Sequence, residues 1–527
     1  MALARTYSVA LVGVHGHVVE VEADIASGLV GMVLVGLPDT ALREARDRIR
    51  AAVLNSGEQW PQRRITVGLS PASLPKRGSG FDLPIAVALL AAAGALNAAA
   101  LAGVMFLGEL GLNGQLRPVH GVLPAAAAAA AAGLCTAVVA PANAREAALV
   151  PGLRTVSAPT LAALLGRMRG AAAAGGAVAE LAGQPGEPPP GGAHPGPGAR
   201  GPAARGPAMD LSDVLGQPIA RRAAEICAAG GHHLSLLGPP GAGKTMLAER
   251  LPTILPRLDA AAALEVTSIH SVAGTLPEDS PLMTGPPFCG PHHTATKAAI
   301  VGGGSGTIRP GAASLSHRGV LFLDEAPEFG RDVLDALRQP LESGEVVIAR
   351  CGITARFPAR FTLVLAANPC PCARAAASPR SACSCSPAAR RRYLGRLSGP
   401  LLDRVDVKVE LLPVGRAELL NDRAFTETSA TVAARVAQAR RRAARRLAGT
   451  PWHVNAEVPG AELRRSYPPG RDALAPLERA IELGEISARG VDKVVRVSWT
   501  LADLAGKDRP TVAECGYALG LWLGVVT

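Results

Sequence analysis

Cysteine is scarce in this chain, with nine residues among 527, and the odd number argues against a disulfide framework. A secretory signal is also missing, because only a short apolar stretch separates Arg5 from His15 and His17. Both absences favour a reducing compartment. We therefore expect a cytoplasmic protein.

Hydrophobic runs long enough to cross a membrane are absent too, with one apparent exception. Residues 83–108 carry no charge, but the stretch is mostly alanine, begins with Leu83 and Pro84, and is interrupted by Gly94 and Asn97. This composition favours a buried helix followed by the strand GVMFLG. The alanine run at residues 125–132 likewise predicts a helix packed against a sheet, so we expect no membrane partner.

Residues 167–208 have few large apolar side chains. They are almost wholly Gly, Ala, Pro and Arg, which offer too little apolar surface to offset the entropy lost on ordering. We expect a disordered linker there. Because 527 residues are too many for one core, the chain should divide into several domains. The boundaries that we predict give folded parts at residues 1–166, 209–412 and 413–527.

Lysine is rare, yet the chain is strongly basic. Arginine supplies 48 of the 54 basic residues, and the net charge is +11. Such an excess favours phosphate-rich partners such as nucleic acids. Arginines concentrate at residues 390–396 and 439–446, and on a helix the second run shares one broad face with Arg435. A solvated helix surface and a nucleic-acid contact both fit this pattern.

What the chain does contain is a phosphate-binding loop. Residues 234–245 read LSLLGPPGAGKT, an apolar strand followed by the spacing GxxxxGKT. Glycines let backbone N–H groups turn toward phosphate oxygens, Lys244 can reach the β- and γ-phosphates, and the Thr245 hydroxyl can bind Mg²⁺. The spacing therefore predicts an ATP site. Its expected nucleotide-binding residues are Gly238, Pro239, Pro240, Gly241, Ala242, Gly243, Lys244, Thr245 and Met246.

The second half of this site follows at residues 320–325, where four apolar residues run directly into Asp324 and Glu325. This is the pattern of a Walker B motif. Asp324 can hold Mg²⁺ through water, and Glu325 can polarise the water that attacks the γ-phosphate. The strand FTLVLAANP then delivers Asn368 to the same sheet edge, where its amide could hold that water, as sensor 1 does in AAA+ ATPases. An exposed strand end capped by acids is the competing interpretation.

Four cysteines cluster directly after Asn368. Cys370 and Cys372 form CPC, and Cys383 and Cys385 form CSC ten residues later. This pairing can surround one tetrahedral Zn²⁺, although CxC is less common than CxxC. Structural zinc, buried thiols and a redox pair all stay open. In each case the cluster would shape the loop beside the nucleotide.

The order of these motifs resembles the ComM family, also called YifB, of magnesium-chelatase-like AAA+ ATPases. The resemblance covers nearly the whole chain. It is carried by the segments ARTYSVALVGVHGHVVEVEADI, GQPIARRAAEICAAGGHHLSLLGPPGAGKT, PHHTATKAAIVGGG, RPGAASLSHRGVLFLDEAPEF, LRQPLESGEVVIAR, NPCPC, LSGPLLDRVDVKVE and VRVSWTLADLAG.

The resemblance implies an α/β multidomain architecture whose residues 1–166 form a domain similar to the proteolytic domain of Lon. Alignment with the catalytic segments of Lon places Gly80 at the position of the nucleophilic serine and Leu123 at the position of the lysine base. The neighbouring Ser79 has only Lys76 near it in the sequence. Peptidase chemistry needs both groups, so we expect a domain that is not a protease.

Residues 209–412 should then form a P-loop AAA+ core with a parallel sheet and an insert before Walker B, because Lys244 and Asp324 are eighty positions apart. The insert has room for a hairpin around IVGGGSGTIRPG, flanked by Lys297 and Arg309. In a ring its tip would face the pore and follow a phosphate backbone. A purely structural surface loop is the alternative.

His292 and His293 stand just before this hairpin. We expect packing or hydrogen-bonding roles for them, because no third ligand is spaced to complete a metal site. The family usually has an arginine where this chain has Cys289, which leaves that position without an expected contact.

Residues 413–527 should form a helical lid. The resemblance assigns Arg404 of LLDRVD as an arginine finger that reaches the nucleotide of a neighbouring subunit, where it would neutralise transition-state charge. A salt bridge to a neighbouring aspartate is the alternative. Arg496 is the best sensor 2 candidate and Arg489 the second, and both would contact nucleotide from above.

By resemblance, the protein is an ATP-driven homo-hexameric motor that acts on single-stranded or branched DNA. Its activity would be helicase-like branch migration in homologous recombination, as in natural transformation, with recombination proteins among its partners. Two other functions stay open: a magnesium-chelatase-type motor subunit and an ATP-dependent protein-remodelling factor. DNA-stimulated ATP hydrolysis would separate the first function from the other two.

Overall fold

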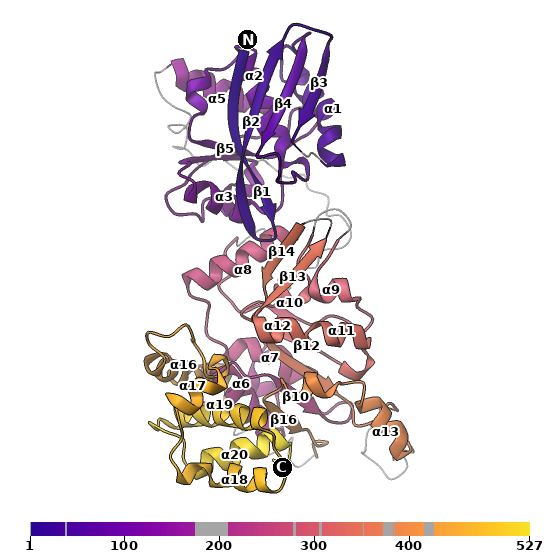
Figure 1. Ribbon diagram of the computed structural model, residues 1–527, viewed down its shortest axis with the longest axis vertical. Helices are drawn as coiled ribbons and strands as arrows, with labels where there is room; N and C mark the ends of the chain where they lie inside the picture. The colour runs from indigo at the N-terminus through magenta and orange to yellow at the C-terminus, as the bar shows by residue number, and fades with distance from the viewer. Residues whose placement is uncertain are drawn as a thin grey trace.

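The computed structural model describes residues 2–36, 39–173, 209–277, 281–304, 308–350, 353–372, 383, 385–415 and 426–526. The molecule is elongated, with an α/β domain at the N-terminal end, a second α/β domain in the middle and helices at the C-terminal end (Figure 1). This arrangement confirms the predicted mixed α/β class. Of the predicted linker, residues 174–208 lie outside the described residues.

A seven-stranded sheet in the order β3-β4-β2-β1-β5-β8-β9 forms the N-terminal domain. Its strands are β1 (Ala2–Val12), β2 (His15–Ala26), β3 (Gly31–Val35), β4 (Arg64–Ser70), β5 (Val104–Leu107), β8 (Thr136–Val139) and β9 (Arg154–Ser157), with a small pair β6 (Glu109–Leu110) and β7 (Leu116–Arg117). Its helices are α1 (Thr40–Asn55), α2 (Asp82–Ala92), α3 (Val122–Ala131), α4 (Ala144–Ala147) and α5 (Leu161–Ala173).

Alternation along β5 explains how helices cover both faces of this sheet. Phe106 belongs to the core shared with α1, α2 and α5, whereas Met105 belongs to the core shared with α3 and α4. The uncharged stretch at residues 83–108 is thus a buried helix and a strand, as predicted, and the alanine run is a helix against the sheet. Helix α5 continues through residues 167–173 with Met168 buried, which extends the folded part beyond the predicted boundary.

The middle domain contains a parallel sheet in the order β11-β12-β15-β10-β16. The strands are β10 (Leu234–Leu237), β11 (Phe288–Cys289), β12 (Val320–Leu323), β15 (Thr362–Ala367) and β16 (Val407–Glu410). The helices are α6 (Pro218–Gly230), α7 (Lys244–Ile254), α8 (Ala260–Ala273), α9 (Lys297–Val301), α10 (Ala312–Leu315), α11 (Arg331–Ala336), α12 (Arg338–Ser343), α13 (Pro387–Leu394) and α14 (Gly399–Leu402).

The C-terminal helices share one hydrophobic core with one face of the parallel sheet. Leu236 of β10 and Val409 of β16 belong to the same buried cluster as Trp499 and Leu521. The helical end is therefore packed against the sheet. Its helices are α16 (Ser429–Arg446), α17 (Gly460–Arg465), α18 (Ala475–Glu482), α19 (Ala488–Ala505) and α20 (Val512–Leu523).

Segments α8 to α10 fill the predicted insert between the P-loop helix and β12. The predicted hairpin closes with two backbone hydrogen bonds between Gly303 and Arg309, and residues 305–307 at its tip lie outside the described residues. A second hairpin, β13 (Glu345–Arg350) and β14 (Ile353–Pro358), follows Walker B and was not predicted.

This second hairpin and α8 meet the N-terminal domain (Figure 1). Phe357 and Val272 pack with Val12 at the end of β1. The Ser271 hydroxyl donates to the carboxylate of Glu146, and the backbone carbonyl of Ser271 accepts from the N–H of Gly121 at 3.1 Å. The two α/β domains therefore form a polar and apolar contact far from the linker in sequence.

Within the described part of the chain, no helix has both the length and the apolar character needed to cross a membrane.

Candidate nucleotide-binding site

The carboxyl ends of three parallel strands bring the predicted site residues together. Strand order β12-β15-β10 places Asp324, Asn368 and the loop that begins at Gly238 side by side at one sheet edge. Buried strands ending in polar loops are the usual location of ligand sites in open α/β sheets. The fold thus assembles a site from residues separated by more than one hundred positions.

Backbone geometry explains the glycines of the loop. Gly241 and Gly243 have φ angles of 80° and 91°, a region that residues with a Cβ rarely adopt. Gly243 directly precedes α7, whose N-terminus offers unpaired N–H groups and the positive end of the helix dipole. The loop is therefore shaped to hold an anion such as a phosphate chain.

Lys244 lies inside this loop. Its Nζ donates to the carbonyls of Gly238 at 2.7 Å and Pro239 at 2.9 Å, and to Oδ1 of Asn368 at 3.0 Å. Burial lowers the pKa of Lys244, and the nearby carboxylates of Asp324 and Glu325 partly oppose that shift. The ammonium group is thus held where phosphate oxygens would replace neutral carbonyl partners.

The predicted Mg²⁺ ligands also meet. Oγ1 of Thr245 donates to Oδ2 of Asp324 at 2.8 Å, which joins the start of α7 to the end of β12. A hydroxyl and a carboxylate are oxygen donors of the kind that Mg²⁺ takes alongside substrate phosphates. These two residues therefore fit the ion.

Glu325 has an unusual backbone. Its φ of 49° makes it one of two residues other than glycine with positive φ among those described. Its carboxylate Oε2 lies 3.2 Å from Nδ1 of His293, while Nδ1 of His292 bonds the Thr294 hydroxyl at 2.9 Å. The expected hydrogen-bonding role is therefore confirmed for His292, while His293 lies in close contact with the carboxylate of Glu325.

Arg404 lies at the opposite edge of the sheet. It precedes β16, and with His233 and Thr362, which stand at the starts of β10 and β15, it lines a cleft of about 650 Å³. Seven arginine and lysine side chains line this cleft against three carboxylates. The four residues of β10 span about 13 Å between this edge and the P-loop. Arg404 is therefore separated from the nucleotide site of its own chain.

One carboxylate holds two arginines in this cleft. Glu342 of α12 accepts from the guanidinium of Arg404 and, at 2.9 Å, from Arg489 of α19. A hydrogen bond from Arg489 and the two positive charges lower the pKa of Glu342, so it is anionic. The Nε of Arg404 is buried without a hydrogen-bond partner among the described residues. The alternative to the arginine finger, a salt bridge from Arg404 to a neighbouring aspartate, is therefore wrong, because Arg404 pairs with Glu342.

Arg496 lines the same cleft but is more deeply engaged. Its Nε donates to the carbonyl of Val458 at 2.7 Å, and burial lowers its pKa. We predicted that Arg496 and Arg489 contact the nucleotide from above. Neither residue lies above the P-loop of its own chain. Both stand beside Arg404 because α19 packs on the amino-edge side of the sheet.

Comparison with known proteins agrees with this arrangement. The family model described as magnesium chelatase, subunit ChlI, matches residues 210–419. The model described as subunit ChlI of Mg-chelatase matches residues 21–143, and the model described as magnesium chelatase, subunit ChlI C-terminal, matches residues 426–521. Competence protein ComM of Haemophilus influenzae is 41% identical over 523 residues, covering 99% of this chain and 97% of its own. The chain belongs to the ComM/YifB family of magnesium-chelatase-like AAA+ ATPases.

Two further relatives extend this result. An uncharacterized protein of Mycobacterium tuberculosis (strain ATCC 25618 / H37Rv) is 50% identical over 523 residues, with 98% of each chain covered. The uncharacterized protein YifB of Escherichia coli (strain K12) is 40% identical over 510 residues, covering 96% of this chain and 94% of its own. Membership in this AAA+ family implies ATP hydrolysis with Mg²⁺.

The four cysteines of the predicted zinc site lie close together in this ComM/YifB chain. The Sγ atoms of Cys370, Cys372, Cys383 and Cys385 all lie within 4.8 Å of one another, and no other group of three or more His, Cys, Asp and Glu side chains in the described ranges does so. A tetrahedral site with Zn–S bonds of about 2.3 Å has sulfur separations of about 3.8 Å. The residues therefore fit zinc.

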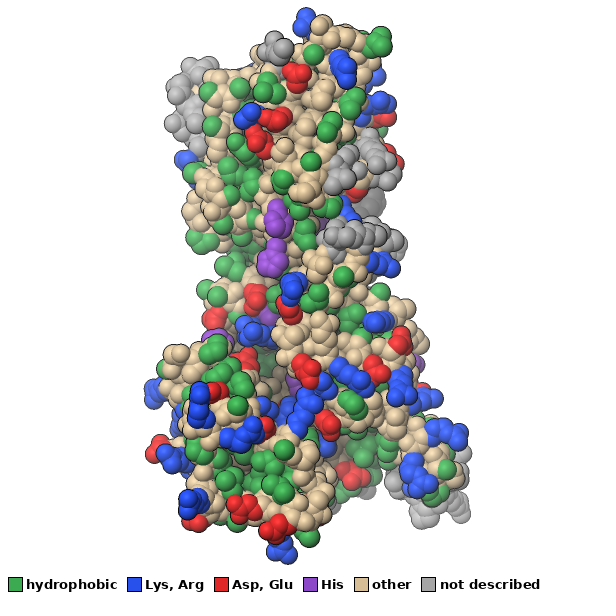
Figure 2. All heavy atoms as spheres, in the orientation of Figure 1, with side chains coloured by type: hydrophobic (Ala, Val, Ile, Leu, Met, Phe, Trp, Pro, Cys, Tyr) green, Lys and Arg blue, Asp and Glu red, His purple; other side chains and the backbone are tan. Residues whose placement is uncertain are grey.

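The two arginine-rich segments differ in environment. In α16, Arg446 pairs with Asp503 and lies over the Trp499 ring, and Arg435 pairs with Glu225. Arg435 and Arg446 therefore hold the helix against its neighbours, a role that was not expected. Arg441, Arg442 and Arg445 of the same helix are exposed, as a solvated helix surface requires. Residues 390–392 of α13 are also exposed, and Figure 2 shows basic side chains gathered over the projecting α13.

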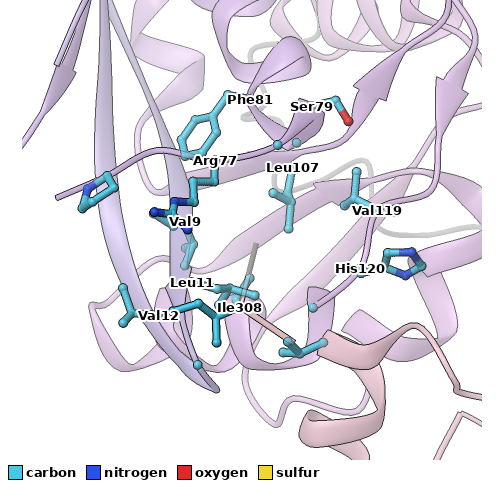
Figure 3. Close-up of a pocket in the computed structure, with 18 of the residues that line it drawn as sticks. Val9, Leu11, Val12, Arg77, Ser79, Phe81, Leu107, Val119, His120 and Ile308 are labelled. Carbon is cyan, nitrogen blue, oxygen red and sulfur yellow. The ribbon is translucent and has the colours of Figure 1, made fainter. Parts of the chain in front are cut away.

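In the N-terminal domain, Ser79 and Lys76, the two residues considered above as a possible peptidase pair, have separate partners. Ser79 donates to the carboxylate of Glu109, whereas Lys76 is buried and donates to the Pro71 carbonyl. Ser79 and Glu109 line a cavity of about 400 Å³ that also receives Ile308 of the middle domain (Figure 3). Lys76 does not line it. The serine thus has a carboxylate partner in place of a lysine.

Proposed function

We propose that this protein is an ATP-hydrolysing ring motor, a homo-hexamer, that acts on single-stranded or branched DNA in the cytoplasm. One observation supports the ring most directly: Lys244 and Arg404 lie at opposite edges of the same sheet. A ring in which each subunit presents its amino edge to the P-loop of the next would join them. Such a head-to-tail contact closes into a ring when its rotation is right.

Within one shared site, each side chain has a distinct task. Lys244 binds the β- and γ-phosphates, Asn368 holds the attacking water, and Glu325 accepts its proton. Thr245 and Asp324 hold Mg²⁺, which when bound neutralises charge on the phosphates.

Arg404 would come from the neighbouring subunit to stabilise charge in the transition state. We assign Arg489 before Arg496 as the second trans arginine, because Arg489 is half exposed whereas Arg496 is buried on Val458.

Exposed basic residues support DNA as the substrate. Residues 390–392 on α13 and Lys297 on α9 are exposed, and Arg309 closes the insert hairpin. Cationic side chains at such positions can follow a phosphate backbone without reading sequence. The relative named as a competence protein supports our proposal that the activity is helicase-like branch migration during recombination, alongside recombination proteins.

Reversing the charge of α13 tests the DNA contact. We expect Arg390→Glu, Arg391→Glu and Arg392→Glu together to weaken DNA binding at least tenfold at low salt and to reduce the salt dependence, because fewer counterions are released. ATPase activity without DNA should stay unchanged. Fluorescence anisotropy with a labelled single strand measures the effect.

The matched control changes the charge by the same amount at the far end of the molecule. Arg46, Arg50 and Arg63 are exposed on the N-terminal domain, and replacing all three with Glu should alter binding less than threefold. Equal losses in the two triple variants would contradict a specific contact at α13.

We further propose that the cysteine cluster holds structural zinc beside sensor 1. The purified protein should contain about one zinc per chain, and Cys372→Ser with Cys383→Ser should remove it. The double variant should also lower the unfolding temperature by several degrees. Metal analysis that finds less than about 0.2 zinc per chain would exclude the tetrahedral site.

The N-terminal domain is assigned a non-proteolytic role in this proposal, because Gly80 and Leu123 cannot supply a nucleophile and a base. Stimulation of hydrolysis by an unfolded protein or by a chelatase complex, with no effect of DNA, would instead favour the remodelling factor or the chelatase-type subunit.

A further inference from the structure

Lys493 of α19 makes two contacts to which the proposed function gives no task. Its Nζ donates to the backbone carbonyl of Arg404 at 3.0 Å and lies 2.7 Å from Oδ1 of Asp406. The Lys493 side chain is 14% exposed and that of Asp406 is 1% exposed. Because a buried charge is costly unless it is paired, this ammonium group is held in one place, against the peptide group of Arg404.

The carboxylate of Asp406 fixes this contact to the sheet. Its Oδ2 accepts from the N–H of His233, the residue before β10, at 2.9 Å, and Asp406 itself directly precedes β16. Burial alone would raise the pKa of Asp406, but the positive charge of Lys493 lowers it well below its usual range. Asp406 is therefore anionic, and it joins the Lys493 ammonium group to the amino edge of the sheet.

Spacing along α19 explains how one helix serves both arginines of the cleft. Arg489 and Lys493 are four positions apart, so they share one face of the helix, and both line the cleft with Arg404. The side chains of Arg489 and Arg404 share the carboxylate of Glu342, which is 53% exposed. The two arginine side chains are thus joined by an exposed carboxylate, whereas the Arg404 backbone is joined to α19 by a buried ammonium group.

We propose that Lys493 is a positioning residue for the trans arginine, which fixes the backbone of Arg404 so that the guanidinium meets the γ-phosphate bound by the neighbouring subunit. This inference rests on the proposed role of Arg404. Lys493 itself does not touch nucleotide, because its ammonium group faces Asp406 and the Arg404 carbonyl. The effect can still be large, since misplacing a reacting group by about 1 Å can cost 10²-fold in rate.

Removing the ammonium group should slow hydrolysis without weakening ATP binding. We expect Lys493→Met to lower kcat by about ten- to a hundredfold, the range for a lost charge-assisted hydrogen bond that displaces a catalytic group. ATP affinity, measured by titration with a fluorescent nucleotide, should change less than about twofold, because the P-loop of the same chain keeps its phosphate donors. Lys493→Arg should stay within about threefold of the wild-type kcat, since a guanidinium can donate to both Asp406 and the carbonyl.

A double variant separates positioning from stability. Lys493→Met alone leaves Asp406 buried without its counter-charge, which destabilises the fold. Adding Asp406→Asn removes that charge, so the unfolding temperature should return toward the wild-type value while kcat stays low. Lys507→Met is the matched control, because Lys507 pairs with Glu514 at the same 2.7 Å distance but outside the cleft. Its kcat should equal that of the wild type.

Mixed rings show through which residue Lys493 acts. Lys493→Met subunits keep an intact P-loop and Lys244→Ala subunits keep an intact Arg404, so an equal mixture should recover to about one quarter of the wild-type rate. Lys493→Met mixed with Arg404→Ala should not recover, because neither subunit supplies a correctly placed arginine. A subunit that had merely lost its fold would not be rescued in the first mixture.

The mixtures also distinguish Lys493 from the shared site itself. Recovery of Arg404→Ala with Lys244→Ala, but not of Lys493→Met with Lys244→Ala, overturns positioning by Lys493. A wild-type kcat in Lys493→Met, or in its double variant with Asp406→Asn, overturns it as well. No recovery in either mixture, in preparations shown to form mixed rings, contradicts the shared nucleotide site and the role of Lys493 with it.

Discussion

Replacing Lys244 with alanine should abolish nucleotide binding and leave less than about 1% of wild-type ATP hydrolysis. The ammonium group now bonds two loop carbonyls and Asn368, all neutral acceptors, so negatively charged phosphates are much stronger partners. Loss of two charge-assisted hydrogen bonds, each worth about 1.5–3 kcal/mol, corresponds to a rate loss of roughly two to four powers of ten.

Titration with a fluorescent ATP analogue and a coupled ATPase assay measure both effects. Lys408→Ala serves as the control, because Lys408 lies on β16 over the Trp522 ring and away from the loop. Near-normal hydrolysis by the Lys244→Ala protein would remove the P-loop from the mechanism.

Arg404→Ala should be nearly as damaging although Arg404 lies at the wrong edge of its own sheet. A trans arginine stabilises charge spreading over the γ-phosphoryl group, and its loss costs about 10³-fold or more in rate. ATP affinity should change little, because the P-loop of each subunit stays intact. Arg360→Ala is a control in the same cleft, since Arg360 pairs with Glu457 at 3.7 Å.

Mixing two inactive proteins distinguishes a trans finger from a structural role. In a ring of Arg404→Ala and Lys244→Ala subunits at equal ratio, about one quarter of interfaces join an intact P-loop to an intact Arg404. Hydrolysis should therefore recover to roughly that fraction of the wild-type rate. No recovery at any ratio, in preparations shown to form mixed rings, would contradict the shared site.

The nucleotide site could be predicted from sequence because its signals are local. The segment GPPGAGKT predicts a loop after one strand, and VLFLDE predicts acidic residues after another strand. Only the order of the parallel strands was needed to predict that Lys244 and Asp324 lie close together. The cysteine cluster was equally readable from CPC and CSC, since spacing alone limits how such pairs can approach one another.

Contacts between distant segments could not be predicted in the same way. The pairing of Arg404 and Arg489 with Glu342 depends on how α19 packs on the sheet, which no local pattern encodes. Arg446 shows the same limit: its charge suggested a surface, but Asp503 and Trp499 from α19 enclose it.

The hairpin of β13 and β14 was missed although a signal existed. In the segment EVVIARCGITARFP, ITARFP alternates between apolar and polar residues, EVVIAR is rich in β-branched residues, and a Cys-Gly pair separates them, which favours a hairpin. Its contact with the N-terminal domain through Phe357 is a tertiary feature that this pattern does not reveal.

The DNA motor is tested most directly by the steady-state ATPase rate of rings formed with ATP, measured with and without single-stranded and branched DNA over a series of salt concentrations. We expect stimulation by DNA that fades as salt rises, because basic side chains release counterions from the phosphate backbone. Hydrolysis that is the same with and without DNA at every salt concentration would contradict a DNA motor.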